Sequence, residues 1–372
     1  MVQDTSKQYI NGRYHLHEKL GQGGMGIVHR ATDRLTGETV ALKQVFLPVT
    51  QLFFASRPPS QTTRELRLAL AHEFQTLASM RHPNIISVLD YGFDEAERPF
   101  FTMDYLENAQ TILAAGNGRS AAEKINLLLQ TLEALAYLHR RGILHRDIKP
   151  GNILVVDDNV RVLDFGLSAT KEQATESVGS WQYMAPEVLQ GGAAREATDL
   201  YAVGVLAFQL FAGEHPFDLY AADIRSVMIE AEPDWRKLGV DQRLTAVIRT
   251  LLAKKPALRP QTANEAIRAF NAVLGQSSSQ ETAVSRRQLA IRESYLQAAK
   301  FVGRQAEVVQ LTAALQEAKD GQGSAWLIGG ESGVGKSRLI AEIRTSALVD
   351  GFQVVRGQSR EGGGVPYQLW RQ

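Results

Sequence analysis

A glycine-rich turn near the start of the chain has the spacing of a phosphate-binding loop. Gly21, Gly23 and Gly26 fit the pattern G-x-G-x-x-G. In a dinucleotide-binding fold a helix follows the last glycine, whereas Ile27 and Val28 continue here as a strand, so we expect the glycines to turn a β-hairpin. Because glycine has no Cβ atom, such a turn lets backbone N–H groups approach phosphate oxygens closely. A flexible hairpin without a ligand would explain this pattern about as well.

A lysine inside an apolar strand is the second feature that could do chemistry. Lys43 lies in the apolar and β-branched run Val40–Val45, where a charge is costly unless its ammonium group has partners. Glu73, beside Phe74 on the next predicted helix, could supply that partner. The ion pair would clamp the helix to the sheet and direct Lys43 toward phosphate oxygens. The alternative is a lysine that reaches solvent at a strand edge.

The segment with the most specific spacing is His-Arg-Asp-Ile-Lys-Pro-Gly-Asn at 145–152. Asp-Phe-Gly follows at 164–166 after a short predicted hairpin, and Ala-Pro-Glu occurs at 185–187. With the glycine turn, the strand lysine and the helix glutamate, these motifs follow one another in the order found in protein kinases. The chain therefore resembles the protein kinase family over residues 14–270. This resemblance implies an α+β, bilobal fold with a β-rich N-lobe and a helical C-lobe.

The same motifs can be interpreted through the chemistry of phosphoryl transfer, which needs mainly positioning and charge compensation. Asp164 and Asn152 offer the hard oxygen ligands that Mg²⁺ prefers. Asp147 is expected to accept the proton of the attacking hydroxyl, and Lys149 to neutralise the transferred phosphoryl group. A lysine at position 149 resembles the serine/threonine-specific branch of the family. The predicted catalytic residues are Asp147, Lys149, Lys43 and Glu73, and the predicted metal ligands are Asn152 and Asp164.

The resemblance also implies a nucleotide pocket between the two lobes. Met103 corresponds to the gatekeeper, and the residues from Asp104 to Leu106 correspond to the hinge that reads the adenine edge. Val28 and Ala41 would press on the adenine from one side and Leu154 from the other. The predicted nucleotide-binding residues are Leu20, Gly21, Gly23, Gly26, Val28, Ala41, Lys43, Met103, Asp104, Leu106 and Leu154. ATP and Mg²⁺ are the implied cofactors, with Mn²⁺ as an alternative metal.

An activation loop between residues 166 and 185 is implied as well. Arg146 precedes the catalytic aspartate, an arrangement that in this family accompanies control by phosphorylation of the loop. We expect autophosphorylation at Thr175 or Ser177, and hence self-association. Ser180 stands where the serine/threonine branch usually has threonine. The candidate activation-loop residues are Thr170, Thr175, Ser177 and Ser180. Three further positions have implied structural roles: Glu187 pairs with Arg259, and Asp199 ties the catalytic loop to the core.

Hydrophobic periodicity predicts the elements that position these residues. Apolar residues recur at helical spacing over residues 65–80 and 122–140, and short strands are expected at 153–156 and 160–163. The longest apolar stretch, Leu200–Gly213, is too short to span a bilayer and predicts a buried core helix. A Pro-, Ser- and Thr-containing stretch near 57–63 is interpreted as a surface insertion.

A second nucleotide motif occurs near the end of the sequence. Gly330, Gly335, Lys336 and Ser337 fit the P-loop pattern G-x-x-x-x-G-K-[ST]. We expect an apolar strand at 325–328 before the loop and a helix after it, so that backbone N–H groups can hold phosphates. Residues 301–372 thus resemble the start of an ATPase module of the STAND and AAA type.

The predicted domain organisation has three parts. We assign 14–273 to the kinase domain, 274–300 to a linker that includes a helix, and 301–372 to the N-terminal part of a P-loop ATPase domain. The α/β sheet of that last domain cannot be completed in this length, and no acidic residue after the P-loop ends an apolar strand. We therefore interpret the ATPase domain as incomplete and the chain as part of a longer signalling regulator.

Composition excludes several other classes of protein. The 372 residues contain no cysteine and have a net charge of +1, which excludes thiolate chemistry and gives no support for nucleic-acid binding. Neither a signal peptide nor a membrane span is visible, and a cytoplasmic location is expected.

Two alternatives to an active kinase stay open at this point. A nucleotide-binding pseudokinase scaffold would be favoured by loss of the strand lysine or of either motif aspartate, and all three are present. A regulator driven by its ATPase would need the acidic residue that is missing after the P-loop. The expected partners are ATP and proteins that carry serine or threonine.

Overall fold

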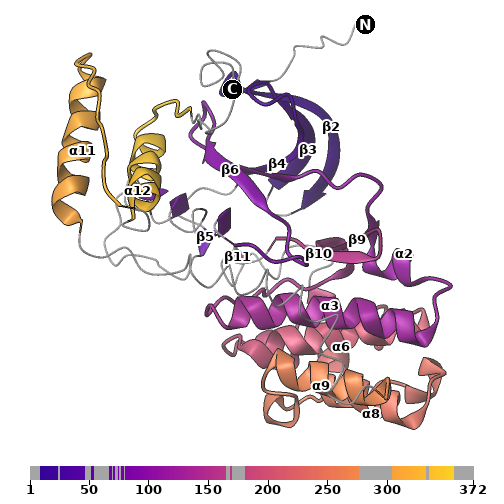
Figure 1. Cartoon of the computed structure of the whole chain (residues 1–372). Coiled ribbons are helices and arrows are strands. Elements are labelled where there is room, and N and C mark those ends of the chain that lie inside the picture. Colours follow the sequence, from indigo (N-terminus) through magenta and orange to yellow (C-terminus); the bar gives the residue numbers. More distant parts are fainter. Residues whose placement is uncertain are drawn as a thin grey trace, which may run out of the picture.

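The computed structural model describes most of the chain. The described residues are 9–23, 26–46, 52–53, 67–68, 70–71, 74, 77–78, 80–164, 168–169, 181–275, 304–331 and 335–355. A lobe of strands lies above a lobe of helices, and a pair of helices from the end of the sequence lies beside the strand lobe (Figure 1). The predicted α+β, bilobal arrangement is confirmed.

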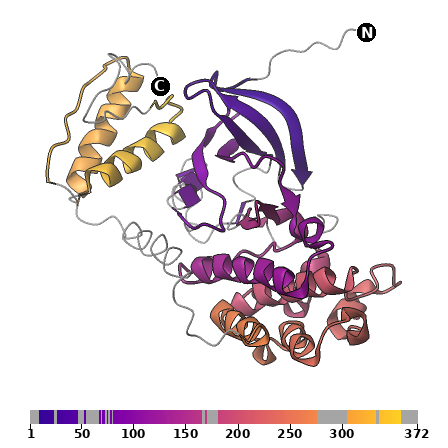
Figure 2. The same cartoon turned by 45° about the vertical axis from the view of Figure 1, so that its right-hand side comes forward.

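A six-stranded antiparallel sheet forms the N-lobe. Its strands, in spatial order, are β1 (Tyr9–Ile10), β2 (Tyr14–Gly23), β3 (Gly26–Asp33), β4 (Thr39–Val45), β7 (Pro99–Asp104) and β6 (Val88–Phe93). The apolar run expected at residues 40–45 is the buried strand β4. The sheet is curled (Figure 2). Side chains on one of its faces form a small core that includes Tyr14, Leu16, Ala31, Leu42 and Phe100.

The turn between β2 and β3 requires glycine at one position. Gly26 has a φ of +158°, and a Cβ atom added there would lie 1.9 Å from the carbonyl oxygen of Gln44. Any other residue would therefore push β3 away from β4. The glycine pattern reflects this close backbone approach as well as any contact with a ligand.

The helix expected over residues 65–80 is confirmed at the positions that the structure describes. Residues 67–68, 70–71, 74 and 77–78 are helical, and Leu70, Phe74 and Leu77 are buried against the sheet. Glu73 and the predicted insertion at 57–63 lie outside the described residues.

A two-stranded pairing before that helix was not predicted. Strand β5 (Leu52–Phe53) pairs antiparallel with β11 (Ser168–Ala169), which follows the Asp-Phe-Gly motif. The segment after β4 is therefore joined by backbone hydrogen bonds to the segment after the motif.

Helices make up most of the C-lobe. They are α2 (Ile112–Gly116), α3 (Ala121–His139), α5 (Pro186–Leu189), α6 (Glu196–Ala212), α7 (Ile224–Glu230), α8 (Gln242–Leu251) and α9 (Ala263–Val273). Helix α3 begins with a capping box, in which the Glu123 carboxylate accepts a hydrogen bond from the Ser120 N–H at 2.8 Å. Helix α6 is buried along nearly its whole length and ends at Gly213 in a left-handed conformation, which confirms the predicted core helix.

A small sheet on the C-lobe carries the catalytic loop. Strands β8 (Gln110–Thr111), β9 (Ile153–Val156) and β10 (Asn159–Val162) pair antiparallel. The two strands predicted near residues 153 and 160 are therefore confirmed. Because Ile153 pairs with Val162, they place the catalytic loop and Asp164 side by side at the same end of the hairpin.

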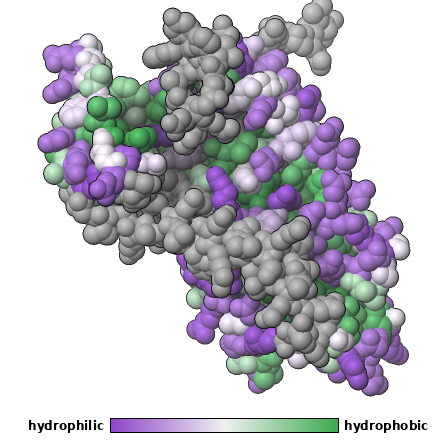
Figure 3. Space-filling view, in the orientation of Figure 1, coloured by the Kyte–Doolittle hydropathy of each residue, from purple (hydrophilic) through white to green (hydrophobic). Residues whose placement is uncertain are grey.

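The last described part of the chain contains α11 (Gln305–Lys319) and α12 (Lys336–Val349). The helix expected after the P-loop is confirmed as α12. The strand expected at 325–328 is wrong, because these residues adopt no regular structure and find no partner strand among the described residues. Leu327 is 99% exposed and Trp326 54% exposed. Apolar side chains accordingly reach the surface in this part of the molecule (Figure 3).

None of the described helices combines the length and the apolar character that crossing a bilayer requires.

Candidate active site

Asp147 lies at the centre of a cluster of polar contacts in the catalytic loop. Lys149 Nζ lies 2.8 Å from Asp147 Oδ2, and Asn152 Nδ2 donates to the same oxygen at 2.8 Å. Asn152 is fixed by the short 3₁₀ helix Pro150–Asn152 and also donates to the Asp147 carbonyl at 2.8 Å. Both side-chain contacts use Oδ2. The Oδ1 oxygen of Asp147 is therefore the one suited to accept a proton from a hydroxyl.

Asp199, in helix α6, binds the backbone of the catalytic loop. Its carboxylate accepts hydrogen bonds from the N–H groups of His145, at 2.9 Å, and Arg146, at 2.8 Å. Arg146 has a φ of +66°, a strained conformation for a residue with a side chain, so these two bonds fix an unfavourable turn. The role that the sequence implies for Asp199 agrees with this geometry.

Asp199 keeps its charge despite complete burial. Burial acts to raise its pKa, but the hydrogen bond from His139 Nε2 at 2.8 Å and the electrostatic interaction with that ring outweigh burial and hold the pKa of Asp199 below its usual range. An ionised acceptor forms stronger hydrogen bonds to the loop than a neutral one would.

His145 connects the catalytic loop to the residue before Asp164. Its Nε2 donates to the Leu163 carbonyl at 2.9 Å, and its Nδ1 accepts from the Asp147 N–H at 3.3 Å. Because the ring uses one nitrogen as donor and the other as acceptor, it is neutral. Burial lowers its pKa, which keeps it so at neutral pH.

Lys43 pairs with Asp164. Its ammonium nitrogen lies 2.7 Å from Asp164 Oδ2. Burial acts to raise the pKa of Asp164, but the charge and hydrogen bond of Lys43 more than compensate, so this pKa lies below its ordinary value. The predicted pairing of Lys43 with Glu73 stays a prediction, because Glu73 lies outside the described residues. The contact with Asp164 joins the sheet of the N-lobe to the loop of the C-lobe.

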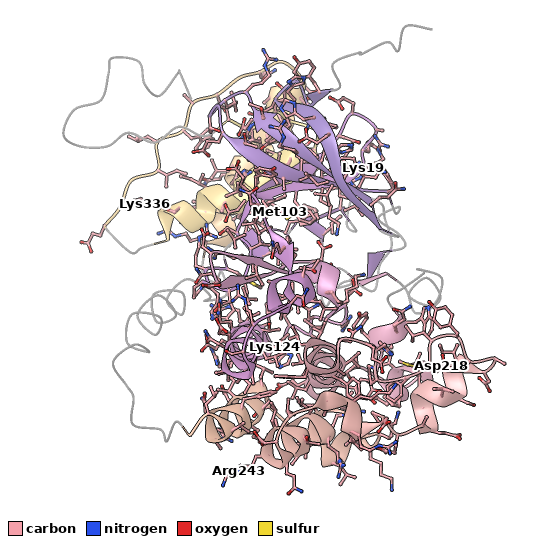
Figure 4. All side chains as sticks on the ribbon, turned by 90° about the vertical axis from the view of Figure 1, so that its right-hand side faces the viewer. Lys19, Met103, Lys124, Asp218, Arg243 and Lys336 are labelled. Carbon is pink, nitrogen blue, oxygen red and sulfur yellow. The ribbon has the colours of Figure 1, made fainter. Side chains whose placement is uncertain are left out.

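One face of the N-lobe sheet is arranged to meet a flat ligand. In the register of the sheet, Val28 lies opposite Lys43, and Ala41 lies opposite Met103. Since alternate residues share a face, these four side chains lie on the same side of the sheet. Met103, in β7, is 3% exposed and lies between Lys19 of the outer N-lobe and Lys124 of the C-lobe (Figure 4). Leu154 of β9 is half-buried on the C-lobe side.

The remaining predicted nucleotide contacts are more exposed. Leu20 is 45% exposed, and Gly21 and Gly23 lie in the same outer part of β2. Asp104 and Leu106 are half-buried at the end of β7, where the chain leaves the sheet for the C-lobe.

The oxygen atoms near Asp147 fit a hard divalent cation. Asn152 donates twice through its amide nitrogen, which leaves its carbonyl oxygen available as a ligand. Asp164 contacts Lys43 through Oδ2 and retains Oδ1. Within the described residues no group of three or more His, Asp or Glu side chains is arranged to hold a metal ion. A cation here would therefore take one carboxylate and one amide from the protein and further oxygens from phosphates and water.

The P-loop begins helix α12. Gly335, with a φ of +91°, caps the helix, and Lys336 Nζ donates to the carbonyls of Gly330 and Glu331, both at 2.7 Å. Lys336 thus closes its own loop, with Ser337 in the next position. Residues 332–334 lie outside the described residues.

Several predicted residues are not described, and some contacts were not predicted. The activation-loop candidates Thr170, Thr175, Ser177 and Ser180 lie outside the described residues. The Glu187–Arg259 pair is present as a two-pronged contact with both N–O distances at 2.8 Å. The pairing of Lys43 with Asp164 and the sharing of Asp147 Oδ2 were missed, because motif spacing identifies residues but not which oxygen each one uses.

Comparisons with known proteins agree with this geometry. The chain is 37% identical over 274 residues to the DNA damage-responsive serine/threonine-protein kinase RqkA of Deinococcus radiodurans, an alignment that covers 69% of this chain and 39% of RqkA. It is 34% identical over 268 residues to the serine/threonine-protein kinase PrkC of Bacillus subtilis, covering 69% and 40%. The chain therefore spans about two fifths of the length of these curated relatives.

Structural and family comparisons extend the same result. The crystal structure of the Mycobacterium tuberculosis PknI kinase domain superposes with a TM-score of 0.53 at 26% identity, over 73% of this chain and 99% of that one. Residues 300–372 match the model of the AAA ATPase domain. Residues 14–269, more than half of the sequence, match the model of the protein kinase domain, and the chain accordingly belongs to the protein kinase family.

Proposed function

We propose that this chain is a serine/threonine protein kinase that transfers the γ-phosphoryl group of Mg-ATP to hydroxyl groups of proteins. The observation that carries the proposal is the shared Oδ2 of Asp147, which contacts both Lys149 and Asn152. That arrangement fixes the carboxylate and leaves one oxygen for the attacking hydroxyl. A serine/threonine preference is supported by Lys149 and by the names of the relatives.

Each predicted residue has a distinct task in this reaction. Asp147 orients the hydroxyl and accepts its proton as the new P–O bond forms, while Lys149 offsets charge on the transferred group. Lys43, beside Asp164, holds phosphate oxygens of the nucleotide. Val28, Ala41, Met103 and Leu154 enclose the adenine, and the backbone from Asp104 to Leu106 binds its edge. Mg²⁺, or Mn²⁺ in its place, supplies charge compensation for the phosphates when held by Asn152 and Asp164.

Transfer of label from γ-labelled ATP to a generic basic protein tests the activity. Asp147→Asn should lower kcat by about 10²- to 10⁴-fold, because it removes the proton acceptor and its charge. Asp157→Asn, in the exposed turn between β9 and β10, is the matched control and should keep full activity. Nucleotide binding should persist in both variants, since neither position contacts the adenine.

The result of this assay also separates a kinase from a pseudokinase scaffold. A chain that binds ATP but transfers no label, to itself or to the basic protein, would contradict the proposal. The intact set of Lys43, Asp147 and Asp164 favours the active enzyme.

Autophosphorylation of the activation loop, with self-association between copies, completes the proposal. A map of phosphorylated sites after incubation with Mg-ATP should include Thr175 or Ser177. Full activity in a variant with alanine at both positions would contradict a phosphorylation switch.

The second nucleotide motif supports a further part of the proposal. Residues 301–372 are assigned to the start of a P-loop ATPase domain, after a kinase domain at 14–273 and a linker at 274–300. We expect Lys336 and Ser337 to bind phosphates of a second nucleotide. A cytoplasmic location and a role in signalling stay predictions.

A further inference from the structure

Strand β6 lies at the edge of the N-lobe sheet and is covered by a helix from the end of the described chain. Helix α12 runs beside it, and the two views of the fold agree on this placement (Figures 1 and 2). The contacts between them combine a buried hydrogen bond, an ion pair and apolar packing.

The hydrogen bond joins two buried hydroxyl groups. Tyr91 Oη of β6 lies 2.8 Å from Thr345 Oγ1 of α12, and the two residues are 3% and 0% exposed. Thr345 donates its own hydrogen to the Ala341 carbonyl at 3.1 Å, so Tyr91 is the donor to Thr345. Because both hydroxyls are buried, separating the two surfaces would exchange this hydrogen bond for hydrogen bonds to water.

The ion pair lies next to this hydrogen bond. The guanidinium of Arg344 contacts the Asp90 carboxylate and lies over the ring of Tyr91, 5.1 Å from its centroid. Asp90 also pairs with Arg13 of the N-lobe at 2.7 Å. The Asp90 carboxylate thus pairs with Arg13 of the N-lobe and with Arg344 of α12, and it would keep Arg13 as a partner if α12 were removed.

Apolar and polar contacts extend the interface in both directions. Val349, 7% exposed, joins the hydrophobic core of the kinase lobes, and Leu348 packs against the same core. Gln353, beyond the helix, donates to the carbonyl of Asn11 at 3.4 Å. The contact therefore runs from the middle of β6 to the turn after β1.

A row of packed rings connects this interface to the active site. The ring of Tyr91 stacks on Phe74 with centroids 5.9 Å apart, and Phe74 packs on Phe101 at 5.3 Å. The ammonium of Lys43 lies 6.0 Å from the centroid of Phe101. At its other end, α12 begins at Lys336. The packed rings and helix α12 therefore lie between the lysines of the two nucleotide motifs.

We propose that the N-lobe surface formed by Asp90 and Tyr91 is a docking site for helix α12 of the P-loop segment of the same chain. The docked helix buries the hydroxyl of Tyr91 and supplies Asp90 with a second cation. The two nucleotide-binding parts consequently form one body rather than two domains joined only by a linker.

Crosslinking in the intact chain tests this docking directly, because the natural sequence has no cysteine. Glu95 accepts a hydrogen bond from the Asn11 N–H at 2.7 Å, and Gln353 donates to the Asn11 carbonyl, so both side chains contact the same residue. The pair Glu95→Cys with Gln353→Cys should form an intrachain link with a short bismaleimide. The control pair Arg243→Cys with Gln353→Cys places one thiol on α8, at the far end of the C-lobe (Figure 4), and should not.

Substitutions on α12 then test which contacts hold the helix. Thr345→Val removes the acceptor at nearly constant shape and should lower the crosslinking rate by roughly fivefold, the factor for one net hydrogen bond. Thr345→Ser keeps the hydroxyl and should restore the rate. Arg344→Glu should lower it further, because two carboxylates would then face each other at Asp90. Asp90 keeps Arg13 in all of these variants, so the N-lobe itself stays folded.

Three outcomes would overturn the proposal. One is equal yields from the Glu95 pair and the Arg243 pair. Another is a crosslinked product found only at twice the mass of the chain, which would make the contact one between copies. The third is a rate that is the same in Arg344→Glu as in the unmodified background.

Discussion

Replacement of Asp199 by asparagine should damage catalysis without displacing the nucleotide. The carboxylate accepts three hydrogen bonds, from the His139 ring and from the N–H groups of His145 and Arg146. An asparagine side chain has one oxygen and an NH₂ group, so it cannot accept all three and places a donor against a donor. The pKa of Asp199 lies below the usual range, so the natural side chain is ionised at pH 7 and the substitution removes its negative charge.

The size of the effect follows from the bonds that are lost. A hydrogen bond to a charged group contributes about 1.5–3 kcal/mol, and the left-handed turn at Arg146 costs about 1–2 kcal/mol that the carboxylate no longer offsets. If the free energy that holds Asp147 in its catalytic position falls by roughly 2–4 kcal/mol, kcat should decrease by roughly 30- to 1,000-fold. Lys43 and the adenine-facing strands are unaffected, so the KM for ATP should change little.

Steady-state kinetics with a protein substrate, together with thermal unfolding, measures both parts of this prediction. Asp218→Asn is the matched control, because Asp218 also accepts a backbone N–H, from Tyr220 at 2.9 Å, but on an exposed loop far from the catalytic residues. An Asp199→Asn variant with unchanged kcat would refute the reasoning. So would a rise in the KM for ATP that accounted for the whole loss of activity.

Three further predictions concern stability and domain independence. Arg259→Leu should lower the free energy of unfolding, measured by urea titration, by about 3–5 kcal/mol, because it leaves the part-buried carboxylate of Glu187 without its cation. The same change at the exposed Arg236 is the control and should have no measurable effect. Burial lowers the pKa of both His145 and His215, so the native state binds fewer protons than the unfolded chain at mildly acidic pH. The melting temperature should therefore fall as the pH drops below about 6.5. A His215→Gln variant should show a shallower fall, because it removes one of the two groups. A chain truncated after Gly275 should still transfer label from ATP to the basic protein, because the active-site residues that the structure describes all precede this position. Loss of transfer would show that the P-loop segment is required.

The kinase lobes could be predicted from sequence because several levels of pattern agreed. Helical periodicity, glycine spacing and the 145–152 motif all required the same arrangement of strands and loops. The helix at Ala121–His139 and the core helix at Glu196–Ala212 have boundaries within a few residues of those expected. Where local preference and tertiary packing agree, sequence reasoning succeeds.

The failures share a different cause. The apolar run at 325–328 has the composition of a strand, but a strand forms only when another one pairs with it, and none does so among the described residues. The contact of Lys43 with Asp164, at 2.7 Å, was likewise not predicted, while the predicted pairing with Glu73 stays untested because Glu73 lies outside the described residues. The Asp164 carboxylate comes from a loop more than a hundred residues later. Its approach depends on how the two lobes close, which no local pattern encodes.

The pairing of Lys43 with Asp164 has a consequence for the order in which ligands bind. Each side chain neutralises the other across the boundary between the lobes. A lone divalent ion would have to compete with an ammonium group for this carboxylate, and lone phosphates would have to compete with a carboxylate for the ammonium group. A metal–nucleotide complex brings both charges together, so the exchange of partners costs little. Binding should therefore be strongly cooperative between metal and triphosphate, with each enhancing the affinity of the other.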